Sequence, residues 1–159
     1  MAVPRMLRLR QNFPRPRVPD VPRAVAEALA GADLKIKRGD TVAVGAGSRG
    51  IANIGIVVGA TVRWLKDLGA RPFVFPAMGS HGGGTPEGQL SVLEHYGITE
   101  STMGCPIRAT MEVVQVGEAL GLPVWLDRHA AEADWIGLVN RVKPHTDFKG
   151  AIESGLFKM

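Results

Sequence analysis

The chain has 159 residues, of which 45% are hydrophobic, and its formal net charge is +4 at pH 7. This length and a mean hydropathy of +0.07 are typical of a soluble globular domain that buries its own core. The single cysteine, Cys105, excludes an internal disulfide and any metal site made of several cysteines. No apolar run reaches membrane-spanning length and the N-terminus lacks an apolar signal core, so we expect a cytoplasmic protein without a membrane partner.

Residues 1–40 are predicted to form an N-terminal lead-in that contains a short helix. Arginine and proline are both frequent in the first 23 positions, and the prolines favour an extended segment over an arm that binds nucleic acid. Residues 21–30 have a helix-forming composition, with Pro22 suited to the first turn and Gly31 to the end. Because no aromatic-rich reader motif accompanies the arginines, we expect no nucleic-acid partner.

From residue 41 onward, strands, glycine-rich loops and helices alternate. Two strand–loop–helix units come first: residues 41–44, 45–50 and 53–68 form one, and residues 73–78, 79–84 and 85–96 form the other. Residues 112–116 and 123–126 are predicted short strands, residues 130–133 a turn of helix, and residues 135–139 a buried strand. Such alternation with short links predicts an α/β fold with a mostly parallel sheet and flanking helices.

In this topology three loops share the edge of the sheet where the strands end: residues 45–49, 79–85 and 141–158. The first two are rich in glycine and each opens a helix, so their backbone N–H groups are placed to bind an anion. The third carries Arg141, Lys143, Lys149 and Lys158, which also favour an anionic ligand. Each loop has an alternative interpretation, since glycine turns before helices often serve packing and charged loops are often only solvated.

Histidine occurs in two of these loops, at His81 and His145. An imidazole titrates near neutral pH, and two of them at one sheet edge form a candidate acid/base pair. His95 lies late in a predicted helix and His129 in a polar stretch, so we interpret both as structural or solvated.

The sequence GSHGGGTPE at residues 79–87, the sequence KPH at 143–145 and the sequence SGLFK at 154–158 resemble motifs of the nickel-pincer-nucleotide lactate racemase family. The resemblance covers about residues 41–159 and is to the N-terminal domain of that family. It implies that His81 and His145 are the two catalytic histidines. It also implies that Arg49, which follows Ser48 in a family-like loop, holds the carboxylate of the substrate.

The same resemblance assigns the cofactor site. Lys158 matches the lysine that tethers the nickel-pincer nucleotide, and Ser48, Ser154 and Gly155 lie in the segments that contact it. The family's nickel-binding histidine comes later than Met159, so the resemblance implies a two-domain protein in which residues 41–159 form part of the catalytic domain and a C-terminal domain follows.

The function that the resemblance implies is racemisation or epimerisation of a 2-hydroxy acid by hydride transfer to the tethered nucleotide. The chain differs from the family pattern at residues 45–47, where GAG replaces an aspartate, and at Gly82, which replaces an arginine. These differences favour a substrate other than lactate. Two alternatives stay open: a non-catalytic module that binds an anion or nucleotide, and a metal-independent acid/base epimerase that uses His81 and His145.

Overall fold

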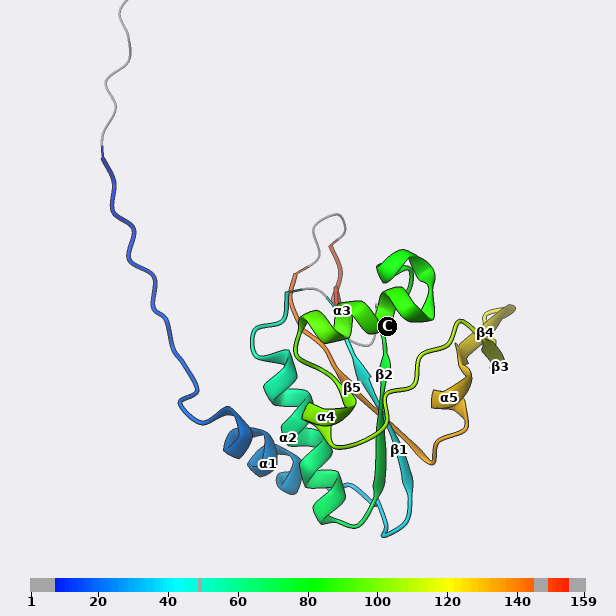
Figure 1. Ribbon diagram of the computed structural model, residues 1–159. Helices are drawn as coiled ribbons and strands as arrows, with labels where there is room; N and C mark the ends of the chain where they lie inside the picture. Colours follow the sequence, from blue (N-terminus) through cyan, green and yellow to red (C-terminus); the bar gives the residue numbers. More distant parts are fainter. Residues whose placement is uncertain (1–7, 49, 145–148, 155–159) are drawn as a thin grey trace, which may run out of the picture.

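The protein is seen as a computed structural model that describes residues 8–48, 50–144 and 149–154. Its centre is a parallel sheet of three strands in the order β2-β1-β5, formed by β1 (Thr41–Ala46), β2 (Arg71–Pro76) and β5 (Trp135–Val139) (Figure 1). The predicted parallel sheet is therefore confirmed. Within the part of the chain that the structure describes, no helix is both long and apolar enough to cross a membrane.

Helices cover one face of this sheet and form the larger core. Alternate residues of β1, Val42, Val44 and Ala46, point to this face, as expected for the two-residue period of a strand. They pack against α2 (Ile54–Asp67), α3 (Pro86–His95) and α4 (Glu100–Met103), whose buried residues include Val58 and Leu93. The N-terminal helix α1 (Val21–Gly31) packs on the outside of α2 (Figure 1).

The opposite face of the sheet is covered by a shorter element, α5 (Arg128–Ala131), whose Ala130 is fully buried against the sheet. Gly45 lies in β1 on this side, and a Cβ atom added to it would stand 2.5 Å from Cδ2 of Leu138 and 3.0 Å from Cζ of Phe75. Gly45 and Ala46 were predicted to belong to an anion-binding loop. That prediction is wrong, because β1 continues through Ala46 and the glycine at position 45 serves close packing of the strands.

The remaining strands, β3 (Val113–Ala119) and β4 (Leu122–Asp127), form a separate antiparallel hairpin that projects beside α5 (Figure 1). The strands themselves were predicted, but they do not extend the parallel sheet. Their connection consists of Leu120 and Gly121, which both have positive φ angles of 52° and 77°. A two-residue turn of this kind joins antiparallel strands, whereas a parallel pair needs a much longer crossover.

Apolar side chains remain exposed on the hairpin and on β5. Residues 135–139 were predicted to be a buried strand, but Trp135 is 36% exposed and Ile136 is 43% exposed. The burial prediction is wrong because, among the described residues, β5 is paired on one side alone, by β1, whereas β2 at the other end of the sheet is also bridged by Ile107. On the hairpin, the exposed apolar residues are Val113, Val116, Leu120, Leu122, Val124 and Trp125. An exposed apolar surface was expected where a further domain would pack, and the existence of that domain stays a prediction.

Candidate functional site

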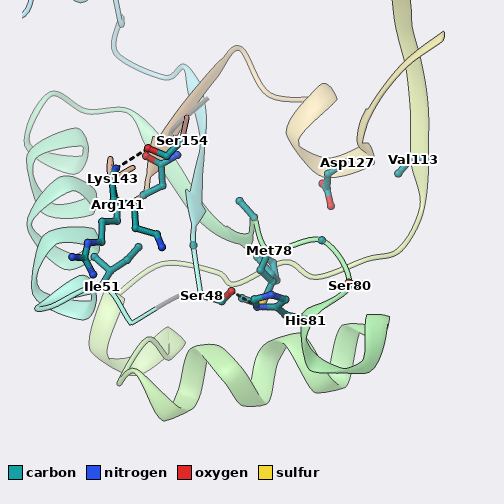
Figure 2. Close-up of a pocket in the computed structure, with 15 residues that line it drawn as sticks. Ser48, Ile51, Met78, Ser80, His81, Val113, Asp127, Arg141, Lys143 and Ser154 are labelled. Atoms are coloured by element: carbon teal, nitrogen blue, oxygen red, sulfur yellow. Dashed lines mark hydrogen bonds between the residues drawn. The ribbon is translucent and has the colours of Figure 1, made fainter. Parts of the chain in front are cut away.

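A cavity of about 530 Å³ lies at the edge of the sheet where the three parallel strands end (Figure 2). Each of these strands contributes the residues that follow it, so the predicted meeting of three loops is confirmed for their described parts. The lining residues are Gly47, Ser48, Ile51, Pro76, Ala77, Met78, Gly79, Ser80, His81, Asn140, Arg141, Lys143 and Ser154, together with Val113 and Asp127 from the hairpin.

The pairing of the strands continues into the loops and fixes where the cavity begins. The amide of Gly47 donates to the carbonyl oxygen of Val139 at 3.1 Å, and the amide of Ala77 donates to that of Ala46 at 3.0 Å. The three strand ends are therefore held in register past their last residues. This register places Ser48, two residues after the end of β1, next to the loop that carries His81.

His81 is half-buried and begins a short 3-10 helix, η1 (His81–Gly84). Its Nδ1 atom lies 2.5 Å from Oγ of Ser48, and this hydrogen bond joins the loop after β1 to the loop after β2 (Figure 2). Sequence motifs singled out both residues, one as catalytic and one as cofactor-binding. The direct contact between their side chains was not predicted.

Two residues near the ends of α3 hold these loops in place. The Nε2 amide of Gln89 donates to the carbonyl oxygen of Gly79 at 2.7 Å, and Gln89 is only 4% exposed. The hydroxyl of Tyr96, just after the helix, donates to the carbonyl oxygen of Ser48 at 2.5 Å. Sequence reasoning missed both supports. The sequence offers one signal for Gln89: it is a polar residue near the start of α3, on a helix face that would be apolar if it served packing alone.

One glycine of the second loop, Gly82, lies in close contact with α3. Gly82 has a φ angle of +64°, and a Cβ added to Gly88 in the first turn of α3 would stand 1.8 Å from the carbonyl oxygen of Gly82. Thr85 caps the helix as predicted, since its Oγ1 accepts from the amide of Gly88 at 3.1 Å. Among the described residues that line the cavity, none belongs to the first turn of α2 or α3. The anion-binding role predicted for these helix starts is therefore not supported at this cavity.

The segment after β5 makes the cationic side of the cavity. Arg141 and Lys143 lie there, and the amide of Lys143 donates to Oγ of Ser154 at 2.7 Å (Figure 2). Ser154, a predicted cofactor-binding residue, is only 9% exposed. Asp127 lies on the hairpin side, where its Oδ1 caps α5 by accepting from the amide of Ala130 at 3.0 Å. Of the charged residues described in the cavity wall, two are therefore cations and one is an acid, an arrangement that favours an anionic ligand.

Four predicted site residues, Arg49, His145, Gly155 and Lys158, lie outside the described residues. Their roles, and the pairing of His145 with His81, stay predictions. Lys149 is described, is exposed and does not line the cavity. Within the described part of the chain, no group of three or more histidine, cysteine, aspartate or glutamate side chains is placed to hold a metal ion.

Comparisons of the chain with protein-family models, with curated proteins and with solved structures find no match. The racemase resemblance therefore depends on the motifs alone.

Proposed function

We propose that the cavity binds a small 2-hydroxy acid and that the chain belongs to a racemase or epimerase of such acids. Support comes from one arrangement: an imidazole, His81, and two cations, Arg141 and Lys143, line the same cavity at the ends of three parallel strands. Ligands of open α/β folds bind at this edge. A volume of about 530 Å³ lies within the range of roughly 300–1,000 Å³ that small-molecule sites occupy.

In this proposal, the carboxylate of the substrate binds to the cationic side of the cavity. Arg141 offers a planar guanidinium that pairs with both carboxylate oxygens, and Lys143 adds a second positive charge. The 2-hydroxyl group then points toward His81, whose imidazole accepts the hydroxyl proton as the substrate becomes a 2-oxo acid and returns it afterwards. His145 is proposed to do the same at the other face of the substrate.

Removing a proton directly from C2 is difficult, because the neighbouring carboxylate destabilises the carbanion. A nickel-pincer nucleotide, when bound, supplies a hydride acceptor that avoids this carbanion. The described residues fit the anionic part of such a group, since Arg141 and Lys143 are cationic and the nearly buried Ser154 lies in the same wall. The proposed tether, Lys158, lies outside the described residues.

A second candidate is a module that binds an anion without chemistry. The same two cations favour it, because Arg141 and Lys143 attract an anion whether or not a reaction follows. The two candidates differ in what they require of His81, which is essential only if a proton is transferred.

The test uses the complete protein, purified from a host that makes the nickel-pincer nucleotide. We expect nickel and sulfur in the purified protein, a covalent adduct in the intact mass, and interconversion of the two enantiomers of a 2-hydroxy acid in chiral chromatography. His81→Ala should slow this interconversion by roughly two to four orders of magnitude. Binding of 2-hydroxy acids without adduct and without turnover would instead establish the anion-binding module.

A further inference from the structure

One side of α3 supports both loops that meet at His81. Gln89 and Tyr96 are seven residues apart, close to two helical turns, so their side chains leave the same side of the helix. Gln89 binds the carbonyl of Gly79 in the loop after β2, and Tyr96 binds the carbonyl of Ser48 in the loop after β1. These bonds position the two loops so that Oγ of Ser48 meets Nδ1 of His81.

The contact occupies one of the two ring nitrogens of His81. Among the described residues, none forms a hydrogen bond to the other nitrogen, Nε2, and His81 lines the cavity. A neutral imidazole carries its proton on one nitrogen and a lone pair on the other. The partner of Nδ1 therefore determines whether Nε2 offers a lone pair or an N–H group to a ligand.

We propose that Ser48 is a positioning residue whose Oγ accepts a hydrogen bond from Nδ1–H of His81 and so holds the tautomer with a free lone pair on Nε2. The inference rests on the proposed function in one respect, namely that His81 accepts a proton from the ligand. After Nε2 gains that proton, Nδ1–H still donates to Ser48, so the ring keeps its place through both protonation states. Tyr96 acts one step further away by fixing the backbone of Ser48.

This assignment changes the role of Ser48. The sequence resemblance makes it a cofactor-binding residue, whereas its side chain lies against the imidazole. A histidine free in solution prefers the proton on Nε2, which is the wrong tautomer for a base that uses Nε2. The net energy of one hydrogen bond is of the size needed to reverse such a preference.

The experiment is nitrogen-15 NMR of the complete protein at about pH 8.5, roughly two units above the ordinary histidine pKa, where free imidazole is neutral. Long-range proton–nitrogen correlation spectra distinguish the two tautomers, and loss of one signal set in His81→Gln identifies His81. We expect the proton on Nδ1 in the unmodified protein and in Ser48→Thr, which keeps the hydroxyl. In Ser48→Ala the Nδ1–H signal should give way to a dominant Nε2–H signal.

Ser80→Ala is the matched control, because it removes a hydroxyl next to His81 that makes no side-chain cap bond to η1. It should leave the tautomer of His81 unchanged. If Ser48→Ala fails to fold, Tyr96→Phe replaces it and should lower the Nδ1–H fraction. A dominant Nε2–H tautomer in the unmodified protein, or an unchanged Nδ1–H signal in a folded Ser48→Ala, overturns the inference. Because the readout needs no turnover, it is independent of whether the protein racemises a 2-hydroxy acid.

Discussion

Replacing Gly88 with alanine tests the close contact between α3 and the loop that carries His81. A Cβ at this position would stand 1.8 Å from the carbonyl oxygen of Gly82, and real Cβ atoms essentially never come within 3.0 Å of another atom. Alanine stabilises a helix relative to glycine by about 0.5–1 kcal/mol. Overpacking typically costs about 1–3 kcal/mol. Because the opposing atom belongs to the backbone and cannot rotate away, the cost of the clash should exceed the gain in helix propensity. Gly88→Ala should therefore lower the free energy of unfolding by about 1–2 kcal/mol.

Gly59 provides the control, since it lies inside α2 and an added Cβ would meet Met103 at an ordinary distance of 3.6 Å. Gly59→Ala should therefore raise the free energy of unfolding by about 0.5–1 kcal/mol, which is the difference in helix propensity between alanine and glycine. Urea unfolding followed by circular dichroism gives both free energies by linear extrapolation. The two substitutions should shift stability in opposite directions. If Gly88→Ala were as stable as the unmodified protein, the contact between Gly82 and Gly88 would not exist as described.

Three further predictions concern the site and the sheet. Lys158→Ala should abolish the covalent adduct in intact mass spectra, whereas His81→Ala should keep it and lose turnover; an adduct on Lys158→Ala would refute the tether. Arg141→Ala should weaken binding of a 2-hydroxy acid about tenfold in calorimetry, which is the contribution expected of one charged hydrogen bond. An unchanged affinity would mean that the carboxylate binds elsewhere. Hydrogen bonds from the hydroxyl and amide of Thr41 lower the pKa of Asp134. Their stabilisation is present at neutral pH and should be lost progressively as the pH falls from about 4 through the lowered pKa of Asp134, and Asp134→Asn should remove this part of the pH dependence of unfolding.

Much of the sheet could be predicted because its signals are local. The apolar runs of β1 and β2 and the helical spacing in α2 require no knowledge of distant residues. The hairpin was misplaced because its pairing is decided by Leu120 and Gly121, and a leucine with positive φ has no sequence signature. Helix α4 was missed since its four residues are too few to display a helical period.

The candidate site was predictable only as far as strand–loop–helix topology determines it. The convergence of strand ends follows from parallel order, so His81, Ser48 and the cations after β5 were expected at one edge. The supports from Gln89 and Tyr96 depend on contacts between distant parts of the chain, and Tyr96 lies 48 positions from Ser48. The position of Tyr96 in the sequence also fits an apolar helix face, so the hydrogen bond from its hydroxyl group was not predicted.

The two halves of the cavity are held by different parts of the fold, so their proposed roles should be separable by substitution. His81 depends on α3, through the loops that Gln89 and Tyr96 support. Lys143 depends on the segment after β5, through its amide bond to Ser154. A change in α3 should therefore disturb His81, the proposed proton-transfer group, and leave the cationic side in place, because the supports from Gln89 and Tyr96 share no residue with the bond between Lys143 and Ser154. Under the proposed function, such changes should lower kcat more than they raise KM, whereas changes in the cationic side should weaken binding first.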